Sequence, residues 1–122
     1  MDRALLILLV AISFSVSGEL LLKHGMNTVG MFSLQPGLII SGLVRTFTNL
    51  FVLGGFSLIF LGSVFWLSVL SRLPLSLAYP LLSLSYVLVV LSAWLILKES
   101  ISVTRVVGVF IIMSGVVVVF RS

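Results

Sequence analysis

The sequence predicts an all-α membrane protein with four transmembrane helices and a short interfacial amphipathic helix between the first two. Of its 122 residues, 61% are hydrophobic and only 8% are charged, whereas a soluble domain has about 25% charged residues. The mean hydropathy is +1.40. The apolar residues form continuous runs and do not alternate with a period of two, which favours helices over a β-barrel. We therefore expect the chain, residues 1–122, to form a single transmembrane domain.

Charged residues separate four apolar runs that are long enough to cross a bilayer, which takes about 20 helical residues. We predict spans at residues 4–22, 49–71, 75–97 and 102–120. The last run is short between Arg105 and Arg121, but long basic side chains can snorkel to the two interfaces. The alternative for the first run is a cleaved signal peptide, with a small-residue cleavage site at Ser15-Val16-Ser17.

Residues 36–48 are predicted to form the interfacial helix, which would lie in the headgroup plane with its apolar face towards the hydrocarbon core. Pro36 suits the first turn of such a helix. On a helical wheel one side carries Ile39, Ile40, Leu43, Val44 and Phe47. A partly ordered loop is the alternative. Because the preceding KHGMNTVG is rich in turn formers, we expect the first span to end before it.

The composition argues against several classes of function. The chain has no cysteine, so it can form neither disulfides nor thiolate sites. One histidine and three acidic residues are too few for most metal or acid–base sites. We therefore expect neither an enzyme nor a metal site. Seven basic and three acidic residues give a net charge of +4. This charge suits anchoring at the membrane surface better than nucleic-acid binding. The basic residues divide almost evenly between the two membrane sides, so the positive-inside rule leaves the orientation open.

Glu19 is the only acidic residue within an apolar run. An acid inside the membrane usually has a partner or a task. One interpretation is an ion pair with Lys23, four residues further along the helix. The other is that Glu19 lines a cavity, because it shares a stripe with Ser15 and Gly18, whose small side chains let a helix or a substrate approach. In a cavity, protonation of Glu19 could be coupled to transport.

The third span carries a proline and three hydroxyl-bearing residues. Pro80 removes a backbone donor and is expected to kink or break the helix. Tyr79, Ser83 and Tyr86 stand at i, i+4 and i+7, so they share a face. This stripe is a candidate lining for a sugar or a phosphate group, and ordinary interhelical hydrogen bonding is the alternative. Trp66, on the second span, is either an interfacial anchor or a further part of the lining.

Two pairs of glycines indicate close helix packing. Gly55 and Gly62 on the second span are seven residues apart, as are Gly108 and Gly115 on the fourth, and such stripes let backbones approach. The other positions of the fourth span are bulky and suit lipid, so we expect its stripe to contact another subunit. Four short helices also enclose little volume beyond their own side chains. A cavity for a sizeable substrate would therefore need a dimer or a larger partner.

Residues 70–119 contain a short loop, an AYPLLSL helix start, a K-E loop and a last helix with regularly spaced glycines. Their sequence is LSRLPLSLAYPLLSLSYVLVVLSAWLILKESISVTRVVGVFIIMSGVVVV. The first helix carries Ser15-Val16-Ser17-Gly18-Glu19-Leu20, followed by Lys23. With these motifs the chain resembles the EamA-type, four-helix members of the drug/metabolite transporter superfamily. It is particularly similar to the small subunits of the flippase for undecaprenyl-phosphate-linked aminoarabinose. The resemblance implies a dimer, with itself or with a similar subunit, that holds substrate between the first three helices of both subunits without a cofactor.

We therefore predict a multi-pass transporter of the bacterial inner (plasma) membrane that translocates a polyprenyl-phosphate-linked monosaccharide of the aminoarabinose type. One alternative is a proton-coupled exporter of small cationic solutes. Small multidrug-resistance exporters share the architecture, but they rely on a glutamate in the middle of the first helix, where this chain has Ser15. A second alternative is a non-transporting membrane partner subunit.

The predicted site replaces water with polar side chains, because a bare sugar phosphate that crosses hydrocarbon faces a large desolvation cost. Lys23 or Arg45 would neutralise the phosphate, while the lipid tail stays in the bilayer. The candidate substrate-binding residues are Ser15, Glu19, Lys23, Arg45, Trp66, Tyr79, Ser83 and Tyr86, and those for subunit packing are Gly108 and Gly115. The expected partners are the lipid-linked sugar, membrane lipids and a second subunit, with no nucleic acid.

Overall fold

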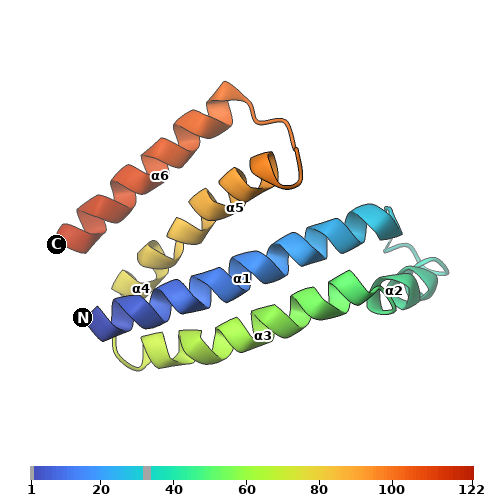
Figure 1. The fold of residues 1–122 in the computed structure, drawn as a ribbon, viewed down its shortest axis with the longest axis horizontal. Helices are drawn as coiled ribbons and strands as arrows, with labels where there is room; N and C mark the ends of the chain where they lie inside the picture. Colours follow the sequence, from blue (N-terminus) through green and yellow to red (C-terminus); the bar gives the residue numbers. More distant parts are fainter. Residues whose placement is uncertain (1, 32–33) are drawn as a thin grey trace.

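The computed structural model describes residues 2–31 and 34–122, and every regular element within them is a helix. The helices are α1 (Asp2–Val29), α2 (Ile39–Phe47), α3 (Leu50–Leu70), α4 (Leu75–Leu82), α5 (Leu84–Leu95) and α6 (Val103–Arg121) (Figure 1). Four segments are long and apolar enough to cross a membrane: α1, α3, α4 together with α5, and α6. The predicted fold class, an all-α membrane protein with four transmembrane helices, is confirmed.

α1 and α3 lie side by side along most of their length (Figure 1). Glycines make this possible, since a Cβ atom on Gly18 would lie 2.6 Å from the carbonyl oxygen of Gly55, and the converse distance is also 2.6 Å. A Cβ atom on Gly62 would lie 3.1 Å from the carbonyl oxygen of Ala11. Small residues allow such backbone contact between membrane helices. The glycine stripe predicted on the second span is therefore used within the chain.

α1 continues for about two turns beyond residue 22, where the first span was expected to end. Contacts with α3 hold this extension, although its residues are turn formers. A Cβ atom on Gly25 would lie 2.8 Å from Cγ2 of Val52, and the His24 ring meets the Phe51 ring edge-on with centroids 4.5 Å apart. The helix ends at Gly30, whose φ of +93° is a conformation that favours glycine.

The stretch between α1 and α3 contains the predicted amphipathic helix rather than a loop, although α2 begins at Ile39 instead of residue 36. Pro36 lies in the preceding turn, where the N–H groups of Leu38 and Ile39 both donate to the carbonyl oxygen of Gln35. Most of the apolar face of α2 is exposed. Its last residue, Phe47, stacks on Phe56 of α3 with ring centroids 5.7 Å apart. An exposed apolar face on a short helix suits contact with lipid.

The third span is broken into α4 and α5 at Ser83. Pro80, inside α4, has no N–H to donate, so the helical ladder is interrupted there. The N–H of Ser83 donates to the carbonyl oxygens of Tyr79 and Pro80, and the Ser83 hydroxyl also donates to Pro80. The break that the sequence predicted is therefore present. α5 ends at Leu95, two residues before the predicted end.

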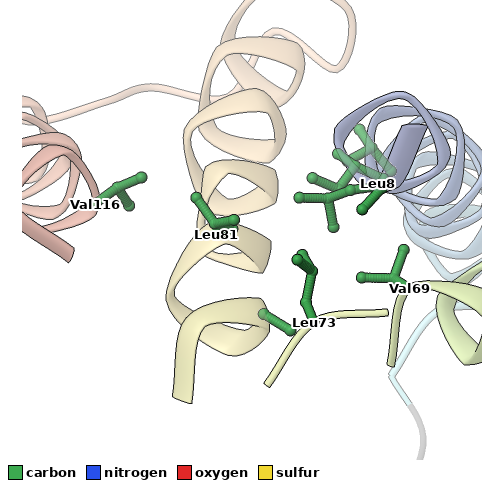
Figure 2. Packing of buried hydrophobic residues seen from close by; sticks show 9 residues of the cluster. Leu8, Val69, Leu73, Leu81 and Val116 are labelled. Atoms are coloured by element: carbon green, nitrogen blue, oxygen red, sulfur yellow. The ribbon is translucent and has the colours of Figure 1, made fainter. Parts of the chain in front are cut away.

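α4 and α5 connect the α1–α3 pair to α6, which is the outermost helix (Figure 1). Figure 2 shows the cluster that joins them, in which buried side chains recur every four residues on α1. The cluster consists of Ala4, Leu8, Ile12, Val16, Val69, Leu73, Ala78, Leu81 and Val116. Val116 is the one residue that α6 buries. Both termini lie at one end of the bundle, and α2 and the α5–α6 connection lie towards the other (Figure 1).

Candidate functional site

A groove between α1, α5 and the α5–α6 connection gathers three charged side chains, and we call it the charged groove. Its volume is about 270 Å³, and its lining consists of Glu19, Leu20, Lys23, Val89, Ala93, Leu97 and Glu99. Glu19 and Lys23 share one face of α1 because they are one turn apart. Val89 and Ala93 are likewise one turn apart on α5, and Leu97 follows the end of that helix. The helical periods of two neighbouring spans therefore build the two walls.

The three charges of this groove are not paired with each other. In the part of the chain that the structure describes, Glu19 and Lys23 form no ion pair, although they are one turn apart on α1. The interpretation of Glu19 as one half of an i,i+4 ion pair is therefore not supported. Glu19 and Lys23 are exposed and Glu99 is half-buried. The groove thus offers two carboxylates and one ammonium group to a ligand.

Glu99 was not among the candidates from the sequence. It follows Lys98, whose φ of +57° turns the chain sharply after α5. Its N–H donates to the carbonyl oxygen of Ala93 at 3.0 Å, which ties the connection back to the end of α5. A usable signal existed, because antiparallel spans place the α5–α6 link at the same end as Lys23.

A second groove adjoins the charged groove and is mainly apolar. Its volume is about 480 Å³, and it is lined by Ser17, Leu20, Leu21, His24, Leu58, Ile96 and Leu97. We call it the leucine groove. Leu20 and Leu97 line both grooves, so a polar and an apolar concavity lie next to each other. A ligand with a polar head and an apolar chain could contact both at once.

Two aromatic candidates meet at the other end of the bundle. The rings of Trp66 and Tyr79 pack edge to face, with centroids 5.3 Å apart and an interplanar angle of 86°. Trp66 is half-buried against the hydrophobic cluster, whereas Tyr79 is 53% exposed. This pair lies near the α3–α4 turn and therefore away from the charged groove (Figure 1).

The remaining candidates are dispersed. Ser15 is half-buried against α3, where its Oγ would lie 3.0 Å from a Cβ atom on Gly62. The Ser83 hydroxyl is engaged at the α4–α5 break. Tyr86 is 59% exposed on α5, and Arg45 is exposed on α2. Within one chain the structure thus brings Glu19 to Lys23 and Trp66 to Tyr79, but it does not join all eight candidates in one site.

The glycine face of α6 is open. A Cβ atom on Gly108 or on Gly115 would meet no atom within 4 Å, so this stripe has no packing role inside the chain. Among residues 2–31 and 34–122, no three His, Asp or Glu side chains gather to form a possible metal site.

Comparison with known proteins gives a consistent result. Residues 3–121 match the EamA-like transporter family. The probable 4-amino-4-deoxy-L-arabinose-phosphoundecaprenol flippase subunit ArnF of Shewanella sediminis is 35% identical over 130 residues, a match that covers 96% of this chain and 87% of the relative. The probable subunit ArnE of the same type of flippase, from Salmonella paratyphi B and from Salmonella typhimurium, is 44% identical over 66 residues, covering 52% of this chain and 60% of the relative. No solved structure matches.

Proposed function

Because the chain belongs to the EamA-like transporter family, we propose that it is a subunit of a flippase that moves a polyprenyl-phosphate-linked monosaccharide across the bacterial inner membrane. The observation that carries this proposal is the identity of 35% over 96% of the chain to a relative named as such a flippase subunit. The four candidate spans agree with a multi-pass membrane transporter. The lipid-linked aminoarabinose named for the relatives is the substrate that we assign to this chain.

The grooves fit the physical problem that such a substrate presents. Moving a sugar phosphate through hydrocarbon without water would cost many kcal/mol, because neither charge nor hydroxyls would be solvated. The charged groove replaces part of that water with Glu19, Lys23 and Glu99. The polyprenyl chain needs no such replacement and can remain in the bilayer.

The second subunit is part of the proposal. The relatives bear the names of two different flippase subunits, and neither groove of the single chain is enclosed. A homodimer, or a heterodimer with a similar subunit, would supply the missing wall. The open face of α6 at Gly108 and Gly115 is the surface that we assign to this contact.

The test is lipid mass spectrometry on the full chain, purified in mild detergent both alone and together with its co-expressed similar subunit. We expect a polyprenyl-phosphate monosaccharide to co-purify and to be flipped between leaflets after reconstitution in liposomes. Absence of any such lipid, together with absence of flipping in both preparations, would contradict the proposal. Proton-driven uptake of a quaternary amine in the same liposomes would instead support a small-cation exporter.

A further inference from the structure

We propose that the charged groove and the leucine groove form one amphipathic site, in which Glu99 together with Glu19 determines the preference for the amine of the lipid-linked sugar. This inference rests on the proposed function and adds to it the side chains that recognise the headgroup. Glu19 and Glu99 contact the ammonium group of the sugar, and Lys23 contacts the phosphate. The leucine groove takes the first units of the polyprenyl chain.

The charges of the groove favour a headgroup that carries both signs. Two carboxylates and one ammonium group share a groove of about 270 Å³ without an ion pair between Glu19 and Lys23. A headgroup with only a phosphate would satisfy Lys23 and leave both carboxylates facing an anion, and like charges brought together are unfavourable. A headgroup with one ammonium and one phosphate satisfies both signs. Hydrogen bonds between charged groups are about twice as strong as neutral ones.

Size and shape lead to the same ligand. Pockets for drug-sized molecules usually measure about 300–1,000 Å³, so the charged groove, at about 270 Å³, suits a headgroup of one sugar ring. Leu20 and Leu97 stand between the two grooves and line both of them. A headgroup in the charged groove would therefore have its chain attached next to the leucine groove. Because the two grooves are adjacent, the site suits an amphipathic ligand better than a free sugar or a free cation.

Backbone geometry fixes the second carboxylate in place. Glu99 stands on the short α5–α6 connection, held by the hydrogen bond from its N–H to Ala93 and by the left-handed conformation of Lys98. Ala93 and Glu99 both line the charged groove. Glu99 is thus presented to the same space as Glu19, which comes from a helix distant in the sequence. Two carboxylates from different elements can contact one ammonium from two sides.

The test compares two synthetic short-chain polyprenyl-phosphate pentoses that differ only in an amine or a hydroxyl on the ring. Binding to the purified full chain, in the oligomeric form in which it is isolated, is measured by native mass spectrometry. We expect the wild-type protein to prefer the amine about tenfold, as charged hydrogen bonds imply. Glu19→Gln and Glu99→Gln should each reduce this preference, whereas Lys23→Met should weaken binding of both lipids. Arg105→Gln is the control, because Arg105 is exposed at the start of α6 and lies outside the lining.

A ligand-side control does not depend on the variants folding. N-acetylation of the amine removes its charge and should weaken binding to the wild-type protein about tenfold. If wild-type protein binds the amine and hydroxyl lipids equally, or if both Gln variants keep the preference, the inference is wrong and the proposed function stands. If wild-type protein binds neither lipid, both alone and together with its co-expressed similar subunit, the proposed function fails and this inference fails with it.

Discussion

At single positions, glycine determines how closely α1 and α3 approach. A Cβ atom on Gly55 would lie 2.6 Å from the carbonyl oxygen of Gly18 and 2.9 Å from Cγ of Leu22. The first contact is with backbone, which cannot rotate away, so one methyl group would force the two helices apart. The close approach therefore depends on the absence of side chains at both glycines.

Gly55→Ala is accordingly expected to lower the free energy of unfolding by about 1–3 kcal/mol, the usual range for overpacking. Thermal denaturation in detergent, followed by size-exclusion chromatography, measures the effect. Gly54→Ala is the matched control, because its Cβ atom would make an ordinary contact of 3.6 Å with Leu21 and alanine is the better helix former. Equal melting temperatures for the two variants would contradict the prediction.

At the residue scale, the close packing predicted from the glycine spacing of the second span is present in the structure. The stripe of Gly55 and Gly62 meets the small-residue face of α1, as the spacing suggested. Glu99 could not be found in this way, because its place beside Glu19 depends on how a loop folds back over another helix. The placement of the candidate binding residues on a substrate stays a prediction.

Among the elements, the broken third span has the clearest functional consequence. α5 carries Val89 and Ala93 into the charged groove, and Leu97 and Glu99 follow it. The direction of α5 relative to α4 depends on the break at Ser83, which follows from the missing N–H of Pro80. The break thus sets where one wall of the charged groove stands.

Pro80→Ala is expected to raise stability and to weaken headgroup binding. The alanine restores an N–H donor four residues after Ser76, and proline inside a helix costs about 3 kcal/mol, so the stability gain has that upper limit. A straighter span moves the α5 wall away from α1, and affinity for the amine-bearing lipid falls. The melting temperature and native mass spectrometry measure the two effects. Pro36→Ala, in the turn before α2, is the control and should change neither the melting temperature nor the affinity. Unchanged affinity of the Pro80→Ala variant would show that the break does not influence headgroup binding.

The elements themselves were largely predictable, because continuous apolar runs between charges define spans in any membrane protein. The ends of the helices were less predictable. α1 runs on to Val29 because His24 and Gly25 pack on α3, and such tertiary contacts override turn-forming composition. The amphipathic helix was predictable from its period, whereas its start at Ile39 depends on a turn closed by Gln35.

For the whole molecule, we propose one explanation for the open grooves and the open face of α6. α6 packs mainly on α4 and α5 and buries a single residue, Val116. Its glycines face no atom of the same chain. A transporter built from four spans needs a second subunit to close a substrate path, and an outermost helix with a small-residue stripe offers the contact surface.

Replacing Gly108 and Gly115 together by leucine should therefore weaken subunit association about tenfold or more. The single chain should stay folded, because a Cβ atom at either position meets no atom within 4 Å. Size-exclusion chromatography with light scattering in detergent measures the oligomer, and capture of the similar subunit from co-expressing membranes measures a heterodimer. Ser114→Leu is the control, since this exposed residue lies about a third of a turn from Gly115. An unchanged oligomer in both measurements, or an equal loss with Ser114→Leu, would show that the glycine face is not the subunit contact and that α6 meets lipid instead.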